Sequence, residues 1–406
     1  MRDVILIASS SRGGSSVFSA FLRRSRALCH LQGEINPFLR LAGLSHPEVG
    51  TGSDILTAQH ALGPAAAQVR AALREESGAP ACQPLSLADW QRFLGILHQR
   101  LRLQWPQLPI RRAEVTACAE AARPHLSASL GSFHAVFLRH LSAAHPAVNP
   151  HYYDLSRRLI AQLCPSERPD GPPSGHVIEE PPFVTVAPWA VAPADDGRPL
   201  VIKTPSNAYR LPFYRALFSD CRLRILHLTR NAAAAINGLY DGWRYPEGFH
   251  AHRVSESLSI AGYSERRPWG RDWWQYDLPP GWRAWTSAPL EAVCGFQWRA
   301  AHAHTLDFLD AHPDIDRIQV RFEDLIGGPQ QSRRALDRVI AWLGVVADPL
   351  LQQSTLLSMP PVMSTDQPRH RRWFEKAALL EPVLQRRDTK QLMERLGYDP
   401  DPDTWL

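Results

Sequence analysis

Lysine is the charged residue that this chain nearly lacks. Only Lys203, Lys376 and Lys390 are lysines, so 42 of the 45 basic residues are arginines. With abundant alanine and proline, this excess is typical of a GC-rich bacterial gene, and surface arginines do not by themselves indicate a nucleic-acid partner. The net charge of +5 and the pI near 9.0 are mildly basic. Such a balance suits a small polyanionic ligand.

Paired cysteines and long apolar runs are missing too. The six cysteines are scattered, and none forms a C-x-x-C pair or joins histidines at zinc-like spacing, so we expect reduced thiols rather than a zinc site or a disulfide framework. No apolar run reaches the roughly 18 residues that cross a bilayer. The first predicted strand begins at residue 4 and leaves no room for a signal peptide. The sequence therefore predicts a cytoplasmic protein without a membrane span.

What the chain does contain is an alternation of strands and helices. Apolar β-branched runs predict strands at 4–8, 200–202, 223–228 and 315–321. Helical spacing predicts helices that begin at residue 17 and span 208–218, 231–240, 289–311 and 332–343, with a further helix in the tail beyond residue 360. Alternation of this kind favours an α/β fold, a mostly parallel sheet flanked by helices. With 406 residues and 44% hydrophobic content, the chain is long enough for one large domain.

Two long segments interrupt this rhythm. Residues 54–165 show helical spacing at 58–76, 85–103, 113–122 and 127–144 and no strand pattern, so we expect an α-helical insertion. Residues 164–199 are rich in proline and mark a boundary. Residues 243–285 are expected to be irregular, and most of a group of seven tryptophans falls there. These tryptophans either cover an apolar acceptor or pack the long segment against the core; the sequence leaves both open.

The most informative segment follows the first strand. Residues 9–16 read Ser-Ser-Ser-Arg-Gly-Gly-Ser-Ser, and a helix opens directly after them. A glycine-rich turn between a strand and a helix N-terminus directs backbone N–H groups at one point and binds phosphate. Compared with the nucleotide P-loop, the segment has Gly14 where the lysine belongs, and its cation is Arg12. A plain Ser/Gly turn is the alternative.

Three further charged residues are predicted to lie near this turn, because ligands of parallel sheets collect at the carboxyl ends of strands. Lys203 ends one strand, and Arg230 ends another just before a helix. Glu34 follows a second short element. A bound anion nearby would favour proton uptake by its carboxylate, which suits a general base. A solvated lysine, a structural salt bridge and a turn cap are the respective alternatives.

Together these residues resemble the sulfotransferases that use 3′-phosphoadenosine 5′-phosphosulfate (PAPS). The 5′-phosphosulfate loop of that family is matched by Arg12, Gly13, Gly14, Ser15 and Ser16. The resemblance covers roughly residues 1–45 and 198–345.

Other motifs match in part. Arg230 corresponds to the arginine of the 3′-phosphate site, but the serine that usually follows eight residues later is Gly238 here, with Asn237 before it. Val17 stands where many members carry a tryptophan beside adenine. The Gly33-Glu34 pair looks like the pair whose glutamate is the proposed base. The segment 321–325, Arg-Phe-Glu-Asp-Leu, is similar to a segment near the end of the family's fold, to which we assign a structural role and no catalytic one.

The resemblance implies a P-loop-like sulfotransferase fold and transfer of a sulfuryl group from PAPS to an acceptor hydroxyl, with adenosine 3′,5′-bisphosphate (PAP) as product. Glu34 would be the base, with His250 and His252 as the next candidates. Arg12 and Lys203 would stabilise charge, and Arg371 would join Arg230 at the 3′-phosphate. We expect no metal, because Asp241 and Asp324 stand alone and the family transfers a less charged group than a terminal phosphoryl.

The identity of the acceptor stays open. A specialised metabolite, a glycolipid and a hydroxyacyl chain on a carrier protein are all compatible with the sequence. We expect no nucleic-acid partner. The alternative from another class is a P-loop kinase or NTPase that uses ATP and Mg²⁺.

Overall fold

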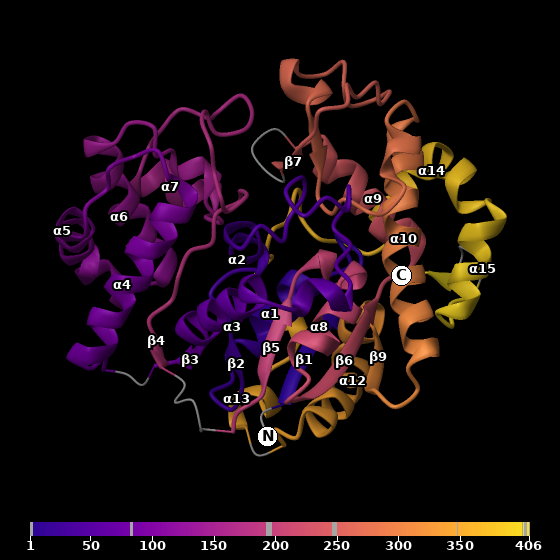
Figure 1. Cartoon of the computed structure of the whole chain (residues 1–406), viewed down its shortest axis with the longest axis horizontal. Helices are drawn as coiled ribbons and strands as arrows, with labels where there is room; N and C mark the ends of the chain where they lie inside the picture. Colours follow the sequence, from indigo (N-terminus) through magenta and orange to yellow (C-terminus); the bar gives the residue numbers. More distant parts are fainter. Residues whose placement is uncertain are drawn as a thin grey trace.

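The centre of the molecule is a seven-stranded sheet (Figure 1). The computed structural model describes residues 3–81, 84–191, 197–245, 250–346, 348–399, 401 and 404–405. In spatial order the strands are β4 (Trp189–Val191), β3 (Gly78–Pro80), β2 (Cys29–His30), β5 (Leu200–Lys203), β1 (Asp3–Ala8), β6 (Arg222–Thr229) and β9 (Asp316–Arg321). From β2 to β9 every neighbouring pair is parallel, and β3 and β4 are antiparallel at the edge. The expected α/β class with a mostly parallel sheet is confirmed.

Helices cover both faces of this sheet. The helices that share a core cluster with its strands are α1 (Ser15–Leu22), α2 (Asn36–Leu41), α3 (Pro64–Glu76), α8 (Leu211–Leu217), α10 (Leu290–Ala311), α11 (Phe322–Ile326), α12 (Pro329–Leu343) and α13 (Pro349–Gln352). The helices α9 (Ala232–Trp243), α14 (Ala377–Leu384) and α15 (Arg387–Arg395) pack with α10 in another cluster. Side chains of β1 alternate between the faces, as a strand requires. Ile5 and Ile7 pack with α1 and α12. Val4 and Leu6 pack with α2, α3 and α8 on the other face.

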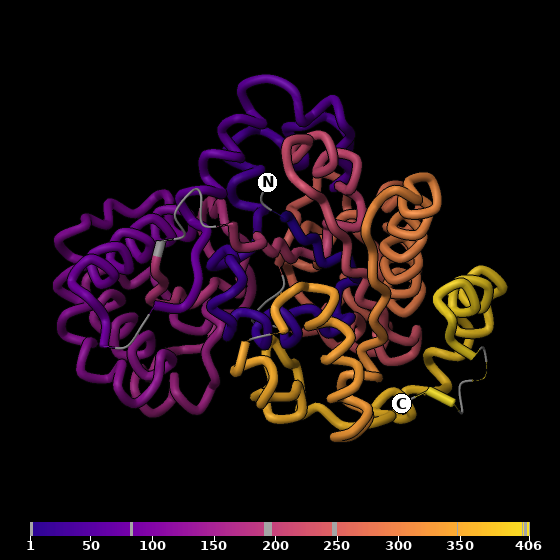
Figure 2. The backbone as a smooth tube through the Cα atoms, turned by 90° about the horizontal axis from the view of Figure 1, so that it is seen from below, coloured from indigo at the N-terminus to yellow at the C-terminus, as the bar shows by residue number. Residues whose placement is uncertain are grey.

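The second half of the predicted insertion has a core of its own. Its helices are α4 (Leu87–Gln104), α5 (Arg112–Ala122), α6 (Leu130–Ala144) and α7 (Arg157–Leu163). Their apolar side chains form one cluster, which extends from Trp90 to Val186. Figure 2 shows this unit at one end of the molecule and the tail helices α14 and α15 at the other. In contrast, α3 packs into the core beneath the sheet.

One expectation for this segment is wrong. We predicted no strand between residues 54 and 165, but β3 lies there and pairs with β2 and β4. The strand has only three residues, Gly78–Pro80. A stretch so short contains no periodic pattern that a sequence could show.

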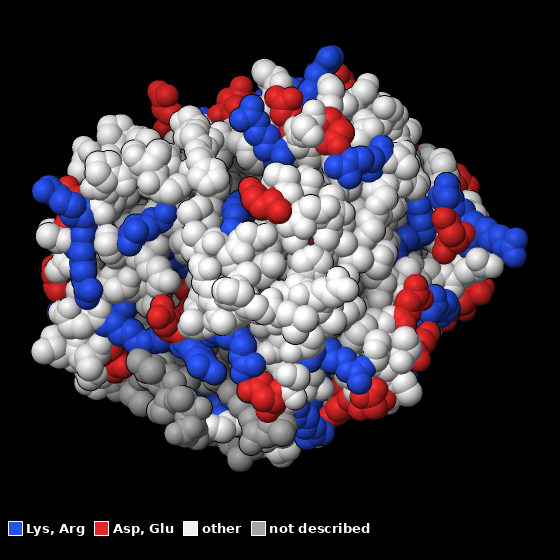
Figure 3. All heavy atoms as spheres, viewed as in Figure 1, with Lys and Arg blue, Asp and Glu red and all other residues white. Residues whose placement is uncertain are grey.

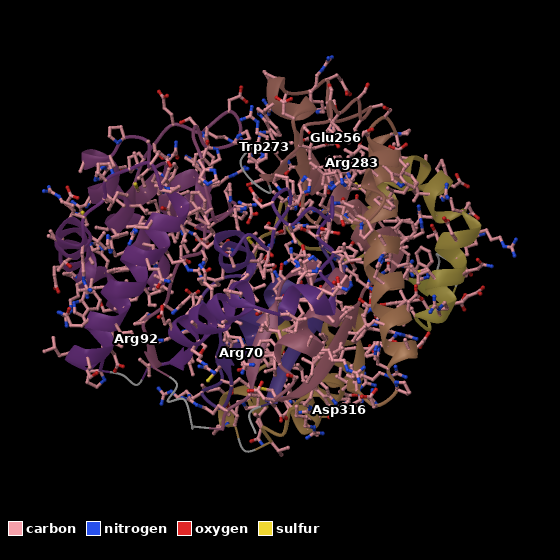
Figure 4. The ribbon with its side chains drawn as sticks, in the orientation of Figure 1. Arg70, Arg92, Glu256, Trp273, Arg283 and Asp316 are labelled. Carbon is pink, nitrogen blue, oxygen red and sulfur yellow. The ribbon has the colours of Figure 1, made fainter. Side chains whose placement is uncertain are left out.

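The Trp-rich segment is less irregular than predicted. It contains a two-stranded antiparallel sheet of β7 (His250–Arg253) and β8 (Trp273–Gln275). Trp243, Trp274, Trp282 and Trp298 are at most 1% exposed and belong to one core cluster. These tryptophans therefore pack the segment against the core, which favours that interpretation over a cover for an apolar acceptor. On the outer rim, Glu256 and Arg283 form an ion pair of 2.5 Å near Trp273 (Figure 4).

Two bulk expectations concern membranes and thiols. Across the described ranges, no helix is both long and apolar enough to traverse a bilayer. Cys118, Cys164 and Cys294 form no disulfide. Cys82 lies outside the described residues.

Candidate active site

The sheet changes its winding direction between β1 and β6. The chain leaves β1 through α1, which packs Phe18 and Phe21 on one face of the sheet. It leaves β6 through α9 and α10, and α10 places Phe308 and Leu309 on the opposite face. Ligands of open parallel sheets bind at the carboxyl edge beside such a switch point. The segments that emerge there are the loop of residues 9–16 and Arg230.

The 9–16 loop has the backbone of an anion-binding turn. Arg12 has φ of 60° and Gly14 has φ of 91°, and the Gly13 N–H donates to the Ser10 carbonyl at 3.1 Å. Turns with left-handed residues gather N–H groups into a concave surface that attracts anions. The helix α1 begins at Ser15, two residues earlier than predicted, so its N-terminus adjoins the turn.

Two buried hydroxyls of this loop have no protein partner. The side-chain oxygens of Ser9 and Ser10 are enclosed and make no hydrogen bond to any described residue. Ser11, in contrast, donates to Asp277. Buried hydroxyls without a partner are costly, unless a ligand completes their hydrogen bonds.

Gly14 connects the loop to Arg230 through an aromatic ring. A Cβ atom on Gly14 would lie 2.3 Å from the ring of Phe322, so no larger residue fits there without moving the ring. The guanidinium of Arg230 lies over the same ring, 5.2 Å from its centroid. Phe322 is the aromatic residue of the segment taken as structural from sequence. Phe322 therefore holds Gly14 of the loop and Arg230 in fixed positions relative to each other.

Arg12, Gly238 and Arg230 are also brought together. A Cβ on Gly238 would lie 3.2 Å from the Cβ of Arg12. Arg230 donates to the Arg12 carbonyl at 3.1 Å. The absence of a side chain at Gly238 of α9 therefore leaves space for the side chain of Arg12. The neighbouring Asn237 accepts a hydrogen bond of 3.1 Å from Lys376. This packing provides a reason for a glycine at the position where the resembled family has serine.

Lys203 and Glu34 form the second part of the site. Lys203 Nζ lies 2.7 Å from Glu34 Oε1 and donates to Ser16 Oγ at 3.3 Å. Lys203 is 12% exposed and Glu34 is 35% exposed, so a carboxylate edge stays accessible. One lysine thus links the first turn of α1 to the candidate base, as predicted from the strand ends.

A chain of hydrogen bonds that we did not predict holds Glu34 in place. Thr204 donates to Glu34 Oε2 at 2.8 Å, and Asn36 donates to the same oxygen at 3.3 Å. Asn36 accepts from Arg210 at 2.6 Å, and Arg210 is paired with Asp54 at 3.1 Å. Both members of that ion pair are at most 2% exposed. Only the position of Thr204 beside Lys203 could have indicated its role; Asp54 and Arg210 are distant in sequence.

The C-terminal tail supplies cations to the Arg230 side. Burial lowers the pKa of Arg230, and the charges of Arg12 and Arg372 act in the same direction. Arg372 also pairs with Asp241 at 2.6 Å, next to a cavity of about 330 Å³. Arg371, the residue predicted for this site, is exposed and lies over the ring of Phe374. Its neighbour Arg372 is instead the tail arginine whose charge acts on Arg230.

The remaining candidates lie apart from a reacting centre. Val17 packs into the core cluster between α1 and α12. His250 is buried beside Gln275, and His252 is 3.5 Å from Asp54. No group of three potential metal ligands occurs among the residues that the structure describes.

Comparison with known proteins adds two similar structures. No family model matches the chain, and no curated protein matches it. The sulfotransferase domain from the curacin biosynthetic pathway is 13% identical with a TM-score of 0.39, over 98% of this chain and 99% of that one. The sulfotransferase domain from the Synechococcus PCC 7002 olefin synthase is 15% identical with a TM-score of 0.39, over 98% and 95%. Similarity at this level assigns neither family nor activity, so the chemistry of the site rests on its own residues.

Proposed function

We propose that this protein is a sulfotransferase that moves a sulfuryl group from PAPS to the hydroxyl group of an acceptor. The observation that carries the proposal is the arrangement of cations around the 9–16 loop. Position 14 has no room for the lysine of a nucleotide P-loop. Arg12 belongs to the loop itself, and Lys203 and Arg230 contact the loop and the start of α1 from the strands on either side of β1.

The residues around the loop fit the two ends of such a donor. The N–H groups of the loop, with the unpartnered hydroxyls of Ser9 and Ser10, suit a 5′-phosphosulfate. Arg230 and Arg372 suit a 3′-phosphate, because guanidinium groups bind phosphate oxygens in pairs. A bound 3′-phosphate would also offset the electrostatic repulsion between Arg230 and Arg372.

Glu34 and Lys203 would carry the chemistry. Glu34 takes the proton of the acceptor hydroxyl, whose oxygen forms a bond to sulfur while the bond from sulfur to the bridging phosphate oxygen breaks. Lys203 and Arg12 stabilise the negative charge that develops on that bridging oxygen. The products are a sulfate ester, PAP and a proton on Glu34 that passes to solvent.

Charge on the visible surface agrees with a small-molecule ligand. On the face drawn in Figure 3, described acidic and basic side chains alternate around the rim, and the centre is largely uncharged.

The test is transfer of labelled sulfate from PAPS to a panel of phenols and alcohols, without added metal. Glu34→Gln should lower kcat by at least 100-fold, because the amide cannot take the proton, and should leave PAP affinity within three-fold, because the amide oxygen can still accept a hydrogen bond from Lys203. Glu256→Gln is the matched control, a glutamate in an ion pair on the outer rim. Near-normal turnover of Glu34→Gln would refute its role. Transfer of phosphate from ATP–Mg²⁺ would instead favour a kinase.

A further inference from the structure

One face of α1 is polar although the rest of the helix is buried. At 100° per residue, Ser16, Ser19, Ala20 and Arg23 project from one side of the helix axis. Ser16, Ala20 and Arg23 are partly exposed, whereas Phe18, Phe21 and Leu22 are buried in the core. This face, which we call the α1 polar face, therefore extends from the Lys203 contact at Ser16 along the helix to Arg23.

Polar atoms gather without partners at the Arg23 end of this face. The Nε atom of Arg23, the hydroxyl of Ser19 and the Nε2 atom of His30 are buried and make no hydrogen bond within the described chain. Ser19 is 2% exposed and His30 is 1% exposed. Burial lowers the pKa of Arg23 to about 10, so its guanidinium is still charged at neutral pH. The negative charges of Glu34 and Asp154 act on this guanidinium, and the positive charge of Arg100 acts against them.

The helical insertion brings a carboxylate to the same place. Asp154 is held by its backbone N–H, which donates to the Phe183 carbonyl at 3.0 Å. The side chain of Asp154 is exposed to solvent, and the positive charges of Arg23 and Lys203 act on its carboxylate. Yet neither Arg23 nor Asp154 has an ion-pair partner within 4.0 Å among the described residues. Each charge therefore acts on the other over a distance longer than that of an ion pair.

We propose that Arg23 binds an anionic group of the acceptor, a carboxylate or a phosphate ester, while the hydroxyl of the same acceptor lies at Glu34 and Lys203. The proposal rests on the sulfotransferase function proposed above. Asp154 is a positioning residue on the opposite side, and its like charge weakens anion binding. Ser16 and Arg23 are about 10 Å apart along the helix axis at about 1.5 Å per residue. The predicted acceptor class is therefore a hydroxy acid or hydroxy phosphate with its two groups separated by several bonds.

The test measures binding of 3-(4-hydroxyphenyl)propanoate and of its neutral amide by calorimetry, with no donor present. The acid should bind at least ten-fold more tightly than the amide. Arg23→Met should remove that preference, and Arg23→Lys should restore part of it. Asp154→Asn should strengthen binding of the acid about three-fold and leave the amide unchanged. Arg24→Met is the matched control, since Arg24 is the next residue, is exposed, and has a guanidinium that hydrogen-bonds to Met359.

The outcomes separate this inference from the proposed function. Loss of the acid preference in Arg23→Met, with PAP affinity within two-fold of the parent, supports a separate acceptor site. Equal binding of acid and amide to the parent protein refutes it, even if PAP binds. A protein that prefers the acid through Arg23 but does not bind PAP keeps the anion site and refutes the sulfotransferase. If Arg23→Met fails to fold, Asp154→Asn alone decides, and unchanged acid binding there contradicts the proposal. A phosphate ester of the same phenol shows which of the two anions Arg23 prefers.

Discussion

Gly14 offers the sharpest perturbation of the proposed donor site. In Gly14→Ala, the added methyl group has two costs. A non-glycine residue at a φ of 91° loses about 1–2 kcal/mol of folding free energy. The Cβ would also lie 2.3 Å from the Phe322 ring, and overpacking of this kind costs about 1–3 kcal/mol. The ring must move, and Arg230 lies over it.

Gly43→Ala separates the two costs. Gly43 has φ of 70°, and a Cβ there meets nothing within 4 Å. It has only the backbone cost, so Gly14→Ala should lose about 1–3 kcal/mol more free energy of unfolding than Gly43→Ala, measured by urea denaturation. Displacing Arg230 removes a charge-assisted hydrogen bond, so PAP should bind about 10- to 100-fold more weakly.

Two results would contradict the proposed coupling of Gly14, Phe322 and Arg230. If Gly14→Ala and Gly43→Ala unfold at the same urea concentration and bind PAP equally well, the contact between Gly14 and Phe322 does not shape the site. If Gly14→Ala is destabilised but binds PAP normally, the coupling between Phe322 and Arg230 is wrong.

Three further predictions follow from neighbouring contacts. Thr204→Val removes a 2.8 Å donor that holds the carboxylate of the candidate base in place, so kcat should fall about ten-fold without a change in PAP affinity. Arg372→Met should weaken PAP binding about ten-fold or more and Arg371→Met less than three-fold, as measured by calorimetry, because only Arg372 lies close enough to influence the arginine that ends β6. Burial lowers the pKa of His227 to about 3 and that of His302 well below 6.5, so both stay neutral in the fold. Unfolding frees them to bind protons, so stability should fall below pH 6.5 by about 1.4 kcal/mol per pH unit for each such histidine, and a flat urea midpoint between pH 7 and 5 would contradict this.

The sequence predicted the parts of the site that lie on short, strongly patterned segments. The 9–16 loop, Lys203 and Arg230 each follow a strand with a clear apolar run, and the carboxyl ends of parallel strands meet at one edge of the sheet. Glu34 was predicted beside them for the same reason, and it contacts Lys203. The chemical roles of these residues stay predictions.

What the sequence could not show depends on contacts between distant residues. Phe322 lies more than 300 positions from Gly14, and no local pattern relates an aromatic ring at the start of α11 to a glycine in the loop after β1. Arg210 and Asp54 reach the base only through Asn36. In the tail, the sequence pointed to Arg371, but that side chain is exposed, and Arg372 is the residue whose charge acts on Arg230.

The most direct test of the account is a metal-free titration of the protein with PAP, adenosine 5′-monophosphate and ATP, and a second titration with ATP–Mg²⁺. The account predicts that PAP binds at least ten-fold more tightly than the monophosphate, because Arg230 and Arg372 bind the extra 3′-phosphate, and more tightly than ATP with or without Mg²⁺. Tighter binding of ATP–Mg²⁺, or equal binding of PAP and the monophosphate, would contradict the proposed donor site.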